Sequence, residues 1–144
     1  PHGALYNDMA ADPELARSVA QCFADILPRM PLVGLAGSLV EQAARRAGLS
    51  FIAEAFVDRR YTEQARLVPR TEAGAVIAEP SKRARQALAL ATGKAIRTSA
   101  GAELRLNADT LCLHSDSDAA LESAAAIRAA LEGAGLAVRP VPIR

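Results

Sequence analysis

Short apolar runs separated by helical patterns constrain this 144-residue chain more than any other feature. Residues 32–36, 51–57 and 110–114 are largely apolar and lack the alternation of a strand with one wet face, so each predicts a strand buried on both sides. The segments between them have helical spacing. Strands that alternate with helices predict a parallel sheet with right-handed crossovers, and therefore an α/β fold.

Two helix starts are marked by capping residues. Asp12 can cap the free amides of a helix that begins at Pro13, a residue suited to the first helical position. Ser38 and Glu41 have the spacing of a capping box directly after the first strand. The first of these helices is expected to bury one apolar stripe, made of Leu15, Val19, Cys22, Phe23 and Ile26.

The second half of the chain is predicted in the same way. Residues 62–74 are polar and indicate a loop, and Pro80 starts a helix. Residues 95–106 turn at a Gly and predict a hairpin or a strand with a return arm. Residues 115–118 are expected to cap a last helix, and residues 136–143 to form a final strand. The expected inner face of that helix consists of Leu121, Ala124, Ile127 and Leu131.

Composition and charge exclude several classes of protein. With 51% hydrophobic and 23% charged residues the chain is typical of a globular domain. A net charge of +1 is too small for nucleic-acid binding by counterion release. The basic groups at residues 45–46 and at Lys82, Arg83 and Arg85 are interpreted as solvated helix faces.

Cys22 and Cys112 are far apart and lie in apolar segments, which favours buried free thiols over a disulfide or a zinc site. We find no signal peptide and no apolar run of membrane length, so we expect no membrane partner and a cytoplasmic location. The sequence begins at Pro1 without Met, and we expect further residues upstream.

Polar side chains gather where the predicted strands end. His2 and Asn7 precede the first predicted helix, Glu54 lies within the second strand, and His114 lies at the end of the third. Chemistry in parallel α/β folds lies beyond the carboxyl ends of the strands, so both histidines are expected at one rim. Glu54 would be costly to bury alone, and we expect a proton donor or cation such as Arg70 or His114 beside it.

Each of these residues also has an ordinary structural interpretation. A strand-end histidine can simply hold a loop, Asp116 can be a helix cap, and Asp58 with Arg59 can be a local ion pair. Two histidines with nearby carboxylates suit either a metal site or an acid–base site, and spacing alone does not decide between them. The sequence contains no P-loop, GxGxxG, GxSxG or HExxH motif.

Five strings in register resemble the LamB/YcsF family over nearly the whole chain. They are residues 1–7 (PHGALYN), residues 33–38 (VGLAGS), residues 54–61 (EAFVDRRY), residues 67–77 with LVPR and GAVI, and residues 109–116 (DTLCLHSD). The resemblance implies an irregular (β/α) barrel of the glycoside hydrolase/deacetylase type. Motifs of the family's N-terminal portion are absent, so residues 1–144 are interpreted as the C-terminal part of a single barrel domain.

The family resemblance also implies a reaction. Members of the family serve as the A component of 5-oxoprolinase, which opens the lactam ring of 5-oxo-L-proline to L-glutamate with ATP hydrolysis, together with subunits B and C. ATP with Mg is then the expected cofactor, with no tightly bound metal; a homo-oligomer is left open. The expected proton-transfer residues are His2, Asp58 and His114. Substrate or phosphate contacts are expected from Asn7, Glu54, Arg59, Tyr61, Arg70 and Asp116.

Two other functions stay open from the sequence. One is a metal-dependent deacetylase or amidohydrolase acting on a sugar or cyclic amide, with His2, His114 and Asp116 as ligands. The other is a non-catalytic scaffolding subunit whose apolar edge binds partner subunits.

Overall fold

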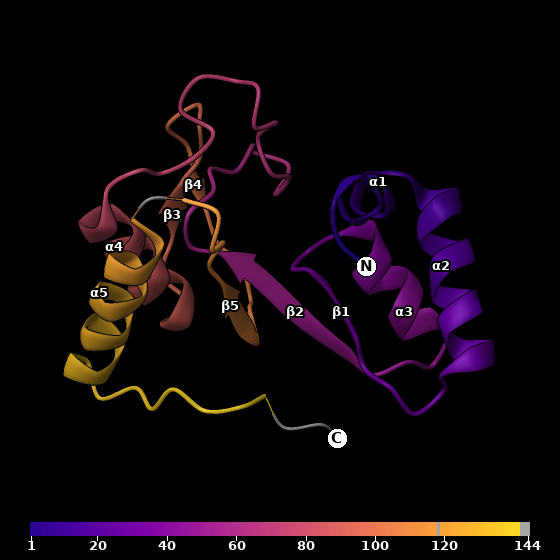
Figure 1. The fold of residues 1–144 in the computed structure, drawn as a ribbon. Helices are drawn as coiled ribbons and strands as arrows, with labels where there is room; N and C mark the ends of the chain where they lie inside the picture. Colours follow the sequence, from indigo (N-terminus) through magenta and orange to yellow (C-terminus); the bar gives the residue numbers. More distant parts are fainter. Residues whose placement is uncertain (118, 142–144) are drawn as a thin grey trace.

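Parallel strands alternate with helices, as predicted, in a computed structural model that describes residues 1–117 and 119–141 (Figure 1). The elements are α1 (Ala4–Ala11), α2 (Pro13–Ile26), β1 (Leu32–Leu35), α3 (Leu39–Arg46), β2 (Phe51–Phe56), α4 (Pro80–Ala91), β3 (Ile96–Arg97), β4 (Glu103–Leu104), β5 (Thr110–Cys112) and α5 (Ala120–Gly133). Strands β1, β2 and β5 form a parallel sheet in that order, and β3 pairs with β4 in the predicted antiparallel hairpin.

The central strand β2 pairs with β1 along one edge and with β5 along the other. Leu35 of β1 lies opposite Glu54 of β2, and Cys112 of β5 lies opposite Phe56 of β2. Successive side chains of a strand point to opposite faces. Ala55 is fully buried in the core, so Glu54 and Phe56 on either side of it share the other face of the sheet.

In the N-terminal region, residues 1–47, α1 and α3 pack against β1, and α2 packs against α1 and α3. The predicted caps are present: the Asp12 carboxylate accepts hydrogen bonds from two backbone amides of α2, and the Ser38 hydroxyl accepts one from Glu41 N. A Cβ on Gly34 would lie 2.9 Å from the ring of Phe51, so glycine permits the close contact between β1 and β2.

In the C-terminal region, residues 51–141, α4 and α5 lie side by side, and α4 packs against β5 at the edge of the sheet (Figure 1). The prediction that Arg83 lies on a solvated helix face is wrong, because its side chain is 1% exposed. Its Nη1 donates to the hydroxyl groups of Ser117 and Ser123 at 3.0 and 2.9 Å. Arg85 is exposed, as predicted.

Three predicted boundaries need correction. Residues 4–11 form α1, which was not predicted, so Asn7 lies within a helix rather than before one. α5 begins after Ala119 without a side-chain cap, although residues 115–118 were expected to provide one; of these, Asp118 lies outside the described residues. Residues 136–141 form no strand, and the remainder of the predicted strand, residues 142–143, is likewise outside the described residues.

Burial along the helices also differs from the prediction. Ala16 and Ala20 are the buried residues of α2, whereas Ile26 is 69% exposed, because the helix approaches its neighbours through its smallest side chains. On α5, Leu121 is 86% exposed although it was assigned to the inner face. The prediction of buried thiols is wrong for Cys22, which is exposed, and holds only in part for Cys112, which is half-buried. No helix within the described residues has the length and apolar character needed to cross a membrane.

Candidate active site

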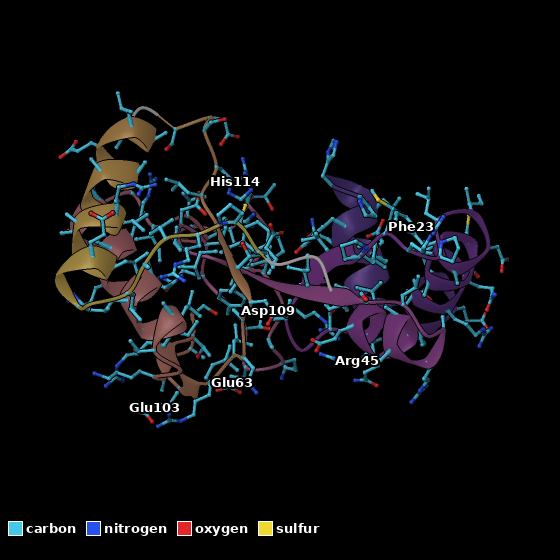
Figure 2. All side chains as sticks on the ribbon, turned by 90° about the horizontal axis from the view of Figure 1, so that it is seen from below. Phe23, Arg45, Glu63, Glu103, Asp109 and His114 are labelled. Carbon is cyan, nitrogen blue, oxygen red and sulfur yellow. The ribbon has the colours of Figure 1, made fainter. Side chains whose placement is uncertain are left out.

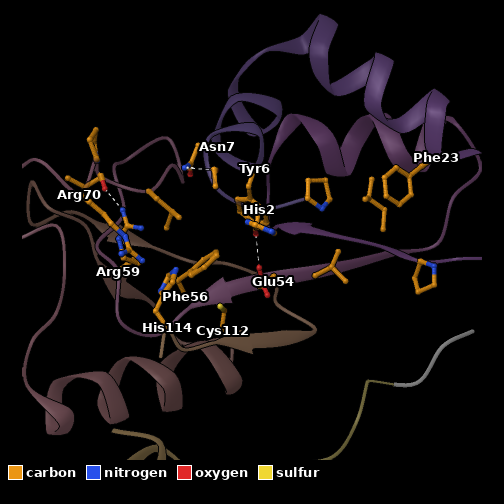
Figure 3. Close-up of a pocket in the computed structure, with 18 residues that line it drawn as sticks. His2, Tyr6, Asn7, Phe23, Glu54, Phe56, Arg59, Arg70, Cys112 and His114 are labelled. Carbon is orange, nitrogen blue, oxygen red and sulfur yellow. Dashed lines mark hydrogen bonds between the residues drawn. The ribbon is translucent and has the colours of Figure 1, made fainter. Parts of the chain in front are cut away.

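A cavity of about 930 Å³ lies over the sheet face that carries Glu54 and Phe56 (Figure 3). Both histidines border it, although one lies near the N-terminus and the other follows β5. The lining consists of Pro1, His2, Gly3, Tyr6, Asn7, Phe23, Pro31, Leu32, Val33, Glu54, Phe56, Arg59, Leu67, Val68, Pro69, Arg70, Cys112 and His114. The cavity therefore draws its wall from both regions of the chain.

Asp58 and His114 form the most closely connected polar pair of the site. They follow adjacent parallel strands, β2 and β5, so the carboxyl ends of these strands bring them together. Asp58 is 2% exposed, and its two carboxylate oxygens lie 3.1 and 2.9 Å from His114 Nδ1. The backbone amide of His114 also donates to Asp58 at 3.2 Å. The His114 ring stacks on Phe56, with centroids 5.2 Å apart.

This geometry fixes the orientation of the imidazole ring. A carboxylate only accepts hydrogen bonds, so the contact with Asp58 favours the tautomer with the proton on Nδ1. Nε2 of His114 then keeps its lone pair, and the ring borders the cavity. Such a histidine can take a proton from a bound molecule and return it later.

Glu54 has a proton donor beside it, as expected, but the donor is Tyr6. The Tyr6 hydroxyl donates to Glu54 Oε2 at 2.9 Å, and no bond from Arg70 or His114 to this carboxylate is found in the described part of the chain. Burial, and then the negative charge of Glu54, raise the pKa of the Tyr6 hydroxyl above its ordinary value. Tyr6 is therefore a neutral hydrogen-bond donor throughout the physiological pH range.

The remaining candidates occupy different positions. Arg59, His2 and Asn7 line the cavity, and the Asn7 amide donates to the backbone oxygen of Gly3. Arg70 also lines it and pairs with Asp116 at 2.8 Å between Nη1 and Oδ2. This hydrogen bond is the main cause that lowers the pKa of the exposed Asp116 carboxyl group.

Tyr61 was expected to contact substrate, and the structure does not place it there. Its side chain is fully buried, it is absent from the cavity lining, and its hydroxyl accepts a hydrogen bond from the backbone amide of Phe56 at 2.6 Å. Burial raises its pKa above the ordinary value. Tyr61 therefore supports the end of β2 from within the core.

Gln86 is a supporting residue that the sequence did not single out. Its side-chain amide donates to the carbonyl oxygens of Phe56 and Arg59 at 2.9 and 2.8 Å, across the end of β2. On the same face of α4, Arg83 holds Ser117 in the segment that follows His114. Both residues have helical spacing to the buried Ala87 or Leu90 of α4, and this spacing is the signal that could have identified them.

Residues 1–117 and 119–141 contain no group of ligands for the metal site that the alternative function requires. No three His, Cys, Asp or Glu side chains there are grouped closely enough to hold a metal ion, and the set of His2, His114 and Asp116 is not such a group. Cys112 borders the cavity as a neutral thiol, because burial raises its pKa to about 12.

The fold and the cavity together define an α/β protein with an oriented histidine–carboxylate pair at the carboxyl ends of parallel strands. The chain belongs to the LamB/YcsF family, whose model matches residues 1–143.

Curated relatives and a solved structure agree with this membership. The chain is 46% identical over 139 residues to the A component of 5-oxoprolinase from Heliobacterium modesticaldum, and the match covers 96% of the chain and 55% of the relative. It is 46% identical over 140 residues to the same component from Paracidovorax citrulli, with 97% and 56% covered. The crystal structure of a lactam utilization protein from Thermus thermophilus superposes with a TM-score of 0.84 at 42% identity, over 96% of this chain and 55% of that one. The chain thus spans about half the length of the relatives it matches.

Proposed function

We propose that this chain supplies the acid–base groups of the A component of a 5-oxoprolinase, which opens the lactam ring of 5-oxo-L-proline to L-glutamate with ATP hydrolysis. The proposal is supported by the names of the relatives and rests on one observation, the Asp58–His114 pair at the cavity. The partners in this proposal are subunits B and C. ATP with Mg belongs to it as well, and among the described cavity residues the guanidinium groups of Arg59 and Arg70 have the chemistry to contact phosphoryl oxygens.

The chemistry of a lactam explains what such a pair would do. An amide carbonyl resists attack by water, and ATP would activate it by transferring its terminal phosphoryl group to the carbonyl oxygen, with ADP as the leaving group. His114 Nε2 would take a proton from the attacking water and deliver it to the ring nitrogen as the C–N bond breaks. A second water would then hydrolyse the resulting acyl phosphate to the carboxylate of glutamate and inorganic phosphate. Asp58 would hold the imidazole in place and stabilise its protonated form during this transfer.

Tyr6 and His2 would act on the other side of the substrate. The Tyr6 hydroxyl holds Glu54 toward the cavity, where its carboxylate can accept a hydrogen bond from the lactam N–H. His2 also borders the cavity and is a second candidate for proton transfer. Its role would be secondary, because no described residue orients its ring as Asp58 orients that of His114.

The test is ATP-dependent release of glutamate from 5-oxo-L-proline by the protein reconstituted with subunits B and C. His114→Ala is expected to lower turnover by about 100-fold or more, the usual contribution of a general acid–base group. Asp25→Asn, at an exposed carboxylate outside the cavity lining, is the control and should leave turnover unchanged.

Circular dichroism and the melting temperature establish that each variant is folded. Unchanged turnover in a folded His114→Ala variant would end the proposal. Binding of subunits B and C in that case would favour a scaffolding role instead, and stoichiometric zinc would favour the metal-dependent hydrolase.

A further inference from the structure

Two arginine residues meet at one end of the cavity. Figure 3 shows Arg59 and Arg70 together, beyond Phe56 and His114, with Glu54 further along the cavity. Arg59 directly follows Asp58 after β2, and Arg70 lies in the loop between β2 and α4. The cavity therefore has a cationic end and, near its middle, a carboxylate.

The Arg59 guanidinium is incompletely satisfied by the protein. The residue is 6% exposed, and its Nη2 donates to the carbonyl oxygen of Val68 at 2.6 Å. Its Nε is buried without a hydrogen-bond partner among the described residues. A buried guanidinium normally has its donors paired, because an unpaired charged donor is costly in a low-dielectric site.

The charges around Arg59 are also unbalanced. Burial, and next the positive charge of Arg70, lower its pKa, whereas Asp58 and Asp116 act in the opposite direction. The Asp58 carboxylate is already engaged by His114. A small anion at this position would relieve the repulsion between the two guanidinium groups.

Arg70 has a counter-ion that can be exchanged. Its partner Asp116 is 61% exposed at the side chain, and Arg70 itself is 47% exposed. Exposed ion pairs contribute little free energy, so an incoming oxyanion can replace the Asp116 carboxylate at small cost.

We propose that Arg59 and Arg70 form an oxyanion subsite of the cavity, which binds the carboxylate or phosphoryl group of a small molecule and for which Asp116 is the exchangeable counter-ion. The subsite itself rests on the geometry, and only the choice of ligands to test rests on the proposed function. Because Glu54 repels an anion, the charged group of the ligand lies at the arginine end and its neutral part toward Tyr6 and Glu54. The ring of such a ligand then lies beside His114, between the arginine end and Glu54.

Calorimetric titration of the purified protein tests this subsite directly. The ligands are 5-oxo-L-proline, its uncharged analogue 2-pyrrolidinone, and inorganic phosphate. Arg70→Gln is expected to weaken binding of the oxyanion ligand by about tenfold or more, as for the loss of one charge-assisted hydrogen bond. Asp116→Asn removes the counter-ion of Arg70 and is expected to strengthen binding of the oxyanion ligand by about threefold, within the range of an exposed ion pair. Arg85→Gln, at an exposed arginine on α4, is the matched control and should change nothing.

The ligands distinguish the two sources of the oxyanion. A selective effect on 5-oxo-L-proline identifies a carboxylate subsite, and a selective effect on phosphate identifies a phosphoryl subsite. 2-Pyrrolidinone should be insensitive to Arg70→Gln in either case. Equal affinity of wild type and Arg70→Gln for both anions, or no binding of either anion at millimolar concentration, would overturn the proposal.

A fourth variant separates this inference from the proposed function. His114→Ala should retain anion binding, since Arg59 and Arg70 remain. Retained turnover in that variant would remove the acid–base role while the arginine subsite stands. If His114→Ala abolishes turnover but Arg70→Gln leaves anion binding unchanged, the acid–base role stands and the arginine subsite is overturned.

Discussion

The N-terminal region and the C-terminal region, which includes β2, are each stabilised by a different kind of contact. In the N-terminal region, buried alanines bring α1, α2 and α3 close together, and the polar contacts are helix caps and pairs within single helices. In the C-terminal region, buried polar side chains on α4 connect the ends of β2 and β5 to the helices. Figure 2 shows the two groups of elements, with His114 in the C-terminal one and Phe23 in the other.

This difference matches what each region contributes to the cavity. Apolar packing is non-directional, and it is sufficient for a region that contributes mainly to the wall of the cavity. Hydrogen bonds fix direction, and the C-terminal region carries Asp58 and His114, whose relative orientation the proposed acid–base role requires. Gln86 and Arg83 hold the two segments that bear this pair. We therefore expect the free energy of unfolding to fall when a buried polar side chain is removed from the C-terminal region or when a buried alanine is enlarged in the N-terminal region.

The largest effect is expected from Arg83→Leu. This change leaves the hydroxyl groups of Ser117 and Ser123 without their buried donor, so the free energy of unfolding should fall by about 3 kcal/mol. Urea denaturation measures it. Arg85→Leu, two positions away but exposed, should change the value by less than about 0.5 kcal/mol. Equal effects of the two changes would mean that the buried arginine does not hold this region.

A smaller effect is expected from overfilling the N-terminal region. Ala16 is 1% exposed, and Ala16→Leu should lower the free energy of unfolding by about 2 kcal/mol because the helices must move apart. Ala11→Leu at the exposed end of α1 is the matched control, with less than about 0.5 kcal/mol expected. Should Ala16→Leu be tolerated as well as its control, close alanine packing would not describe this region.

The smallest effect is expected where the two regions meet through side chains. Tyr6→Phe removes the hydroxyl that donates to Glu54, and should cost about 1 kcal/mol, the usual net value of one hydrogen bond. The same substitution in a Glu54→Met background should have almost no effect, which thermal denaturation can measure. An undiminished cost in that background would show that the hydroxyl acts through another contact.

Much of the fold could be predicted from local signals. The strands of the parallel sheet are apolar runs, and Asp12, Pro13 and Ser38 mark two helix starts because capping is decided by a few neighbouring residues. The α1 helix was missed because it has no side-chain cap and a weak apolar pattern. The final predicted strand was wrong within residues 136–141, where an apolar composition occurs without a neighbouring strand to pair with.

The site was predictable only in part, for a related reason. Parallel strand ends lie at one edge, which is why Asp58 and His114 could both be selected from sequence. Which donor meets Glu54 depends on how α1 crosses the sheet, and that is a tertiary property. The buried positions of Gln86 and Arg83 were not predicted either, because polar residues on a helix are normally exposed.

The proposed function requires that Asp58 and His114 act as one unit in the ring opening. Its most direct test is a double-mutant cycle on ATP-dependent glutamate release, with Asp58→Asn, His114→Ala and the two combined, in variants that remain folded. Residues that act together are non-additive, so the double variant should be no slower than His114→Ala alone. Losses that multiply, or an Asp58→Asn variant with full turnover, would contradict the account.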